Sequence, residues 1–439
     1  MAGTLNQSVV DGLAKRLNEP AWLAELRSRD LRAHAALPWP HASDDIWRRT
    51  DVAQLDPARG GFRPAEPSLL QTLRFSDAAL AAFTRPLGGE SLLVRANGAW
   101  LNPPNTPAGT AVQELAAAAH AEPIRRILEA DGMTDAERKL ASLNGAFHHD
   151  DLVLRVAPGT SVEQPLRLVR LFSAQDKQAL FPLTVITVGA GSAVTILDEY
   201  VSVDADGSAD PARTHLVNGR IELVLERDAA VRYVRLQRWD SRAREFLLQR
   251  ATVAAGASLI MANLSLGAAL SKTHIVTTLA GEGASTKLYG FVFGRDGQHI
   301  DQHTLQDHQA PHTNSDLQYR AALQDASRMV YTGLIRIAKA AQQTTAYQSN
   351  HNLLLSRTAR AETIPMLEIL ADDVQCKHGA SIGPIDDEQT FYLMSRGISR
   401  EAAQRLLVMG FIEPIMQEIP FEPLRERLRR EIEGGLHGE

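Results

Sequence analysis

Short groups of small residues recur along the middle of the chain, and each group precedes a stretch of β-prone residues. The groups are Gly159-Thr160-Ser161, Gly191-Ser192-Ala193, Asp228-Ala229-Ala230, Gly256-Ala257-Ser258, Gly283-Ala284-Ser285 and Asp325-Ala326-Ser327. Their last residues lie 32, 37, 28, 27 and 42 positions apart, which describes a degenerate repeat. Stacked coils of β-structure need tight corners, and small residues fit where successive coils pack closely.

This repeat is compatible with two kinds of β-architecture. No helical segment of about 10–15 residues separates the extended runs, which argues against a doubly wound α/β sheet. Short strands of this kind also occur in β-sandwiches, so periodicity alone leaves the two open. Because the uneven spacing favours a β-helix, we expect a mainly β chain with one elongated β-helix over residues 150–385.

The region before the repeat, residues 1–149, is predicted to be a mostly helical or irregular domain. Residues 8–30 have helical periodicity, which Pro20 divides. Residues 36–68 contain five prolines and are predicted to be irregular. Residues 111–145 are alanine-rich and periodic, and we expect Pro123 to split them into two helices.

The region after the repeat, residues 386–439, is predicted to be a helical domain. Asp386 and Ser399 are suitable N-caps, and Pro414 is expected to interrupt the second helix. The last segment, 421–434, places Leu424, Leu428 and Ile432 on one face. A thin apolar stripe of this kind either packs down on the same chain or binds a partner.

The composition limits the compartment and the partners. One cysteine in 439 residues rules out an internal disulfide framework, which fits a reducing compartment such as the cytoplasm. A net charge of −6 gives no general attraction to nucleic acid or anionic membranes. Residues 251–271 carry no charge but are too polar for a membrane span, so we expect a pair of buried strands with a glycine turn there.

The single cysteine, Cys376, has a histidine two positions later, His378. If this segment is a strand, both side chains point to the same face. Sulfur and imidazole together suit zinc, copper(I) or iron–sulfur chemistry. Two ligands cannot complete a four-coordinate site, so a partner chain would have to supply the others. The alternative is an inert, buried cysteine beside a surface histidine.

Two further patterns are candidate sites. Histidines crowd one segment, at His299, His303, His308 and His312, and could form a metal site, but their spacing matches no standard zinc pattern. The alternative is a set of polar side chains on the surface of stacked strands. Residues 379–383 match the G-x-S-x-G nucleophile elbow around Ser381, although the only later histidine is His437, near the end of the chain.

The stretch from Gly297 to Ile419 carries several short motifs close together. They are Gln298-His299-Ile300-Asp301, Tyr331-Thr332-Gly333-Leu334-Ile335, Asn352-Leu353-Leu354-Leu355-Ser356, Pro365-Met366-Leu367-Glu368-Ile369, Asp372-Asp373-Val374-Gln375-Cys376-Lys377-His378-Gly379-Ala380 and Phe391-Tyr392-Leu393-Met394-Ser395-Arg396-Gly397-Ile398. This stretch resembles the SufB/SufD family of iron–sulfur cluster assembly proteins. The Cys-x-His-Gly-Ala form is more similar to SufD than to SufB, and residues 46–50 also resemble an N-terminal SufD element.

The resemblance implies a right-handed parallel β-helix core flanked by N-terminal and C-terminal helical domains. It implies a non-catalytic role beside a SufB-like chain and a SufC-like ATPase, which would bind the C-terminal helices. Cys376 and His378 fall on the family's positions at the SufB–SufD interface. No cofactor would be tightly bound to the isolated chain, and iron or a nascent cluster would be held transiently in the complex.

Three questions stay open at the level of sequence. The partner would be either a SufB-like paralogue or a second copy of this chain. The chain could be a structural adaptor in which Cys376 and His378 have no metal role. A hydrolase or lyase on a β-helix is the remaining alternative, and it would need a converging acid and base that the sequence does not supply.

Overall fold

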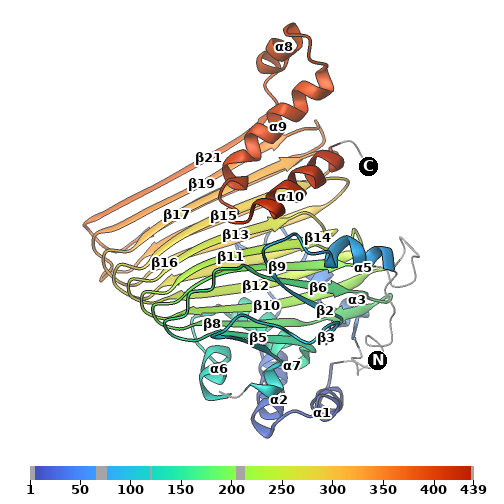
Figure 1. Cartoon of the computed structure of the whole chain (residues 1–439), viewed down its shortest axis with the longest axis vertical. Coiled ribbons are helices and arrows are strands. Elements are labelled where there is room, and N and C mark those ends of the chain that lie inside the picture. Colours follow the sequence, from blue (N-terminus) through green and yellow to red (C-terminus); the bar gives the residue numbers. More distant parts are fainter. Residues whose placement is uncertain (1–4, 66–76, 119–120, 204–212, 437–439) are drawn as a thin grey trace.

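The computed structural model describes residues 5–65, 77–118, 121–203 and 213–436. Within these ranges the chain passes back and forth between two long sheets that lie face to face (Figure 1). Neighbouring strands are parallel throughout the repeat, and the chain completes about eight turns. Helices flank this parallel β-solenoid at both ends. The predicted parallel β-helix is therefore confirmed, and the sandwich alternative is wrong because consecutive strands alternate between the sheets.

Among the described residues, the first sheet has eleven strands and the second has ten. The first contains β1 (Arg63–Pro64), β4 (Thr110–Gln113), β5 (Asp150–Val156), β7 (Gln178–Leu180), β8 (Pro182–Val188), β10 (His215–Leu225), β12 (Ala243–Val253), β14 (Leu270–Leu279), β16 (His299–His308), β18 (Arg328–Ile337) and β20 (Arg360–Ile369). The second contains β2 (Ser91–Ala96), β3 (Ala99–Trp100), β6 (Leu166–Phe172), β9 (Ala193–Ser202), β11 (Ala230–Arg238), β13 (Ser258–Ser265), β15 (Ser285–Gly294), β17 (Asn314–Leu323), β19 (Thr344–Leu354) and β21 (Val374–Pro384).

In chain order, the described helices come before β5 or after β21. The N-terminal ones are α1 (Gln7–Arg16), α2 (Ala21–Ala36), α3 (Pro57–Gly60), α5 (Asp77–Thr84), α6 (Ala121–Leu128) and α7 (Asp135–Phe147), with 3₁₀ turns at Val52–Leu55 and Leu115–Ala117. The C-terminal ones are α8 (Asp387–Ser395), α9 (Arg400–Met416) and α10 (Glu422–Gly435). None of the described helices is both long and apolar enough to cross a membrane.

The corners explain the small-residue groups. At one edge of the solenoid a residue with positive φ begins each corner: Gly159, Gly191, Asp228, Gly256 and Gly283, at φ between 59° and 70°. Each of these residues donates its backbone N–H to a carbonyl in the next turn, at 2.8–3.2 Å. The residue that follows is small because it points into the narrow end of the core. Ala229, Ala257 and Ala284, for example, are fully buried there.

The sixth predicted corner belongs to the opposite edge. Asp325 precedes β18 of the first sheet, whereas the other groups lie at the edge that leads into the second sheet. At the first edge, the next two corners begin at His312 and Gln343, both with φ of 58°. The sequence spacing of 42 thus reflected a change of edge rather than a longer turn.

The N-terminal region differs in part from expectation. Pro20 separates α1 from α2 as predicted. Pro123 does not split a long helix, because it lies in the first turn of α6, where a missing N–H costs nothing. Residues expected to form the preceding helix instead form β4 and a 3₁₀ turn. Strands β2 and β4 extend the second and first sheets respectively.

The helices cover the outer faces of the two sheets. Helices α1 and α7 pack their apolar side chains against the first sheet, and Phe147, for instance, contacts Phe181. Helices α9 and α10 pack against the second sheet (Figure 1). The predicted stripe of Leu424, Leu428 and Ile432 is fully buried in that contact. Helix α9 also continues through Pro414 to Met416, so the predicted interruption at that proline is wrong.

Candidate functional site at the open end of the solenoid

The last strands of the solenoid, β20 and β21, end their sheets. Among the described strands, β20 pairs only with β18 and β21 only with β19. Their outer edges therefore carry backbone N–H and C=O groups without a neighbouring strand in this chain. Figure 1 shows β21 as the outermost strand, beside the base of the projecting α8–α9 segment.

The two predicted ligands lie on β21. Cys376 is paired in register with Ala346, and His378 with Gln348. Both partners on β19 are buried in the interior, so strand alternation directs Cys376 and His378 to the inward-facing side of the sheet. Lys377, between them, faces the opposite side. The spacing argument for a shared face is therefore consistent with the register of β21.

The environments of these two side chains differ. Cys376 is half-buried and packs near Ile335, Ile337 and Ala346. Burial raises the pKa of the Cys376 thiol, so the isolated chain favours the protonated form. His378 is exposed. An exposed imidazole is the more accessible ligand of the two, and the thiol needs a nearby cation or metal to ionise.

The elbow motif at Ser381 lies inside strand β21. A nucleophile elbow places the serine on a sharp turn between a strand and a helix, whereas Ser381 lies within the strand itself. The Ser381 hydroxyl does lie 2.7 Å from Nδ1 of His351. The charged group near His351 is Arg320, which helps burial to lower the histidine pKa, whereas a catalytic triad would place an acid there. His437 lies outside the described residues.

The four crowded histidines do not form one site. His299 and His303 point away from the core on the outer face of the first sheet, and His299 lies 3.4 Å from Thr50. His308 points inward and contacts Thr313 and Ser315. His312 is an exposed corner residue. Only His303 belongs to a group that could hold a metal, together with Glu137 and His274, which the sequence pattern did not single out.

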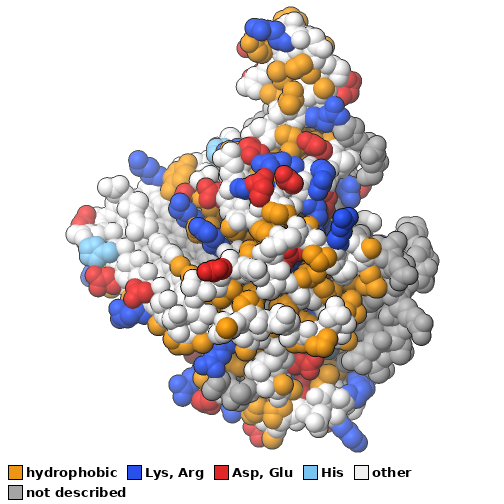
Figure 2. Space-filling view, in the orientation of Figure 1, with side chains coloured by type: hydrophobic (Ala, Val, Ile, Leu, Met, Phe, Trp, Pro, Cys, Tyr) orange, Lys and Arg blue, Asp and Glu red, His pale blue; other side chains and the backbone are white. Residues whose placement is uncertain are grey.

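Large apolar side chains are exposed at this end of the molecule. On and beside the end strands they are Leu367, Ile369, Leu370 and Ile382, which are 38–58% exposed. On the projecting helices they are Phe391, Tyr392, Met394 and Leu406, which are 40–73% exposed. Figure 2 shows hydrophobic side chains gathered on the projecting segment above the solenoid. Exposed apolar groups in such concentration mark interaction surfaces.

Comparison with known proteins finds a family match that covers much of the solenoid. Residues 171–411, more than half of the chain, match the family model of the SUF system FeS cluster assembly, SufBD core domain. This range includes both candidate ligands on β21.

Curated relatives carry the same family description. A protein named "Iron-sulfur cluster assembly SufBD family protein" from Staphylococcus epidermidis is 24% identical over 98% of this chain and 94% of its own length. Similarly named proteins of Staphylococcus saprophyticus and Staphylococcus haemolyticus are 28% identical over 69% of this chain, and the match spans 64% of their own length. The chain belongs to the SufBD family of iron–sulfur cluster assembly proteins.

Proposed function

We propose that this chain is a SufD-like, non-catalytic subunit of a cytoplasmic assembly complex for iron–sulfur clusters. It pairs through β20 and β21 with a SufB-like chain, or with a second copy of itself, and it binds a SufC-like ATPase through its C-terminal helices. It offers His378, and behind it Cys376, to iron or to a nascent cluster. The observation that carries the proposal is the position of both side chains on the outermost strand of an open solenoid end.

The open end supports pairing with another chain. Proteins usually cover or charge the free edge of a sheet, because its unpaired backbone groups invite another strand. Here the edge is long, and Leu367, Ile369 and Ile382 expose apolar surface around it. A partner that adds a strand would satisfy the backbone groups and bury these side chains together.

The ligand count supports a site shared between chains. An iron–sulfur cluster takes about four protein ligands, and β21 offers one thiol and one imidazole. A partner at the open end would supply the remainder. The raised pKa of the Cys376 thiol adds a condition, because the thiolate would form only once metal or a positive group arrives. The isolated chain should therefore bind iron poorly at this position.

The C-terminal helices remain the surface that we propose for the ATPase, but through α8 rather than through the apolar stripe of α10. The stripe of Leu424, Leu428 and Ile432 is buried against the second sheet and is not free to bind a partner. The exposed Phe391 and Tyr392 of α8 are better anchors, since aromatic side chains dominate many interfaces.

Reconstitution of the complex tests the ligand role. We expect His378→Ala to lower the yield of assembled cluster without weakening complex formation, and Cys376→Ala to have a smaller effect. Lys377→Ala is the matched control, because it removes a side chain from the same strand but from the opposite face. Cluster yield would be followed by visible absorbance and iron content. If His378→Ala complexes assemble clusters at the unmodified rate, the chain is an adaptor without a metal role.

A further inference from the structure

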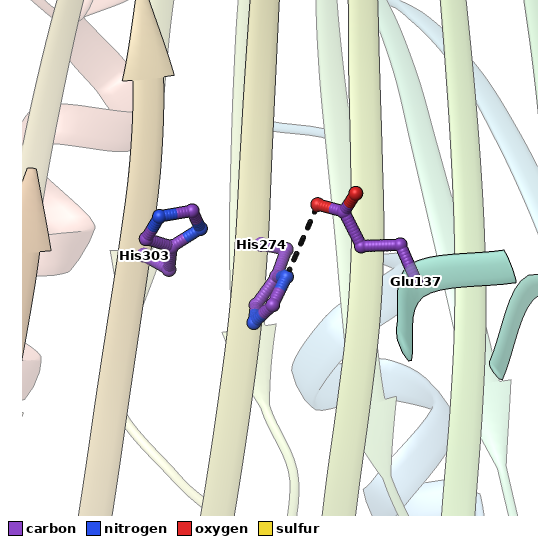
Figure 3. A group of neighbouring side chains, drawn as sticks. All are labelled: Glu137, His274 and His303. Carbon is purple, nitrogen blue, oxygen red and sulfur yellow. Dashed lines mark hydrogen bonds and ion pairs between the residues drawn. The ribbon is translucent and has the colours of Figure 1, made fainter. Parts of the chain in front are cut away.

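A second group of side chains that could hold a metal ion lies far from the open end, on the outer face of the first sheet beneath α7. It consists of Glu137 from the first turn of α7, His274 from β14 and His303 from β16. All three are at least 95% buried. One ligand atom from each lies within 4.8 Å of the others. Figure 3 shows one nitrogen of the His303 ring turned toward the other two side chains.

The two imidazoles are brought together by the register of the solenoid. His274 and His303 are directly paired neighbours in adjacent strands, and their ring centroids are 4.8 Å apart. Glu137 approaches the two imidazoles from α7. The capping box with Thr134 fixes the backbone of Glu137 and one of its carboxylate oxygens. The other oxygen lies 3.3 Å from Nδ1 of His274. Three segments far apart in sequence thus meet at one point.

The group leaves buried polar atoms without partners. Neither ring nitrogen of His303 has a hydrogen-bond partner among the described residues. An unsatisfied buried polar atom costs about 1–3 kcal/mol, so such a set calls for a further ligand. Burial and the nearby Lys272 and His274 lower the pKa of His303 well below its usual range, so that its imidazole is neutral.

The geometry fits a tetrahedral ion. Two ligands of an ion with bonds of about 2.1 Å lie about 3.4 Å apart. The 3.3 Å between Oε1 of Glu137 and Nδ1 of His274 already matches this separation. The ligand atom of His303 lies within 4.8 Å of the other two, about 1.4 Å beyond the separation of two ligands on one ion. The positive charge of the neighbouring Lys272 is offset in part by Asp301, whose carboxylate lies 2.7 Å from the ammonium.

We propose that Glu137, His274 and His303 bind a divalent first-row transition-metal ion, Zn²⁺ or Fe²⁺, which fastens α7 to the β-solenoid. Two imidazoles and one carboxylate are a donor set that both ions accept, with a water molecule in the remaining position. The site is independent of the open end and of the proposed assembly role. It lies partly outside the family-matched range, because Glu137 precedes residue 171.

Metal titration of the full chain tests this proposal. All variants carry Cys376→Ala and His378→Ala, so that the open end contributes no ligand. After chelator treatment, Zn²⁺ and, under anaerobic conditions, Fe²⁺ are titrated separately by calorimetry. We expect one ion per chain and a higher melting temperature with metal. His303→Phe and Glu137→Gln should each weaken binding about a hundredfold or more. His149→Phe is the matched control, a buried histidine beside Phe181 that belongs to no such group.

A spectroscopic readout keeps the test decisive. When Co²⁺ is added to the chain with Glu137 and His303 intact, we expect the strong visible bands of a four-coordinate ion. This measurement does not depend on whether the variants fold. Equal binding by His303→Phe and His149→Phe chains, or no binding by the unmodified group, would overturn the proposal and leave a group that holds only water.

Discussion

Substitutions on the two C-terminal apolar surfaces should affect different properties, namely stability for the buried surface and partner affinity for the exposed one. Leu428 of α10 is 1% exposed and packs against the second sheet, whereas Phe391 of α8 is 73% exposed. We expect Leu428→Ala to destabilise the attachment of α10 without directly removing a partner contact. Phe391→Ala should leave stability unchanged and weaken the binding of a SufC-like ATPase.

The magnitudes follow from burial. Removing three buried carbon atoms from Leu428 loses about 2.4 kcal/mol of transfer free energy, and the cavity raises the total to about 3–5 kcal/mol. Truncating the exposed Phe391 should change stability by no more than about 0.5 kcal/mol. If Phe391 anchors the ATPase, its loss should cost about 2 kcal/mol of binding free energy, which is roughly thirtyfold in affinity.

Amide hydrogen exchange over α9 and α10 measures the first effect, and calorimetric titration with the ATPase measures the second. The two variants serve as controls for each other. A destabilisation below about 1 kcal/mol for Leu428→Ala would refute the packing argument. Unchanged ATPase affinity for Phe391→Ala, with lowered affinity for a still-folded Leu428→Ala, would show that the buried stripe is the docking surface after all.

Two further predictions concern the solenoid itself. Burial alone would raise the pKa of Glu199, but Arg238, Arg427 and Arg167 outweigh it and lower that pKa to about 2. Because the pKa of Glu199 is lower in the folded state, this carboxylate should contribute about 3 kcal/mol to the free energy of unfolding above pH 4.5, and the contribution should be lost as the pH falls toward 2. Urea titrations at several pH values should reveal this loss, and Glu199→Gln should abolish it. Gly256→Ala should lower the melting temperature more than Gly283→Ala: both have φ near 70°, but only at position 256 would the new methyl group meet the side chain of Asp228, at 2.1 Å.

The sequence predicted the solenoid where its corners are glycine or another small residue. A residue with positive φ favours glycine, so Gly191, Gly256 and Gly283 leave a visible pattern. His312 and Gln343 adopt the same conformation at the cost of some strain, and nothing in the sequence marks them. The pattern of small residues therefore predicted the architecture, but it did not locate the corners of the last turns.

The amphipathic C-terminal segment shows a second limit. Periodicity established that Leu424, Leu428 and Ile432 share a face, and burial of that face followed from their hydrophobicity. It did not establish what covers the face, because a sheet of the same chain and a partner subunit offer the same apolar environment. Only the packing against the second sheet distinguishes the two.

The register of a solenoid also separates the two candidate metal sites physically. Each strand residue has lateral neighbours one turn before and one turn after it, so His303 lies between His274 and Thr332 within the chain. His378 has Gln348 on one side and no following strand on the other. A buried site can thus complete its coordination alone, whereas a site on the last strand depends on a second chain. Metal binding at Glu137, His274 and His303 should not vary with protein concentration, and binding at His378 should appear only when the partner is added.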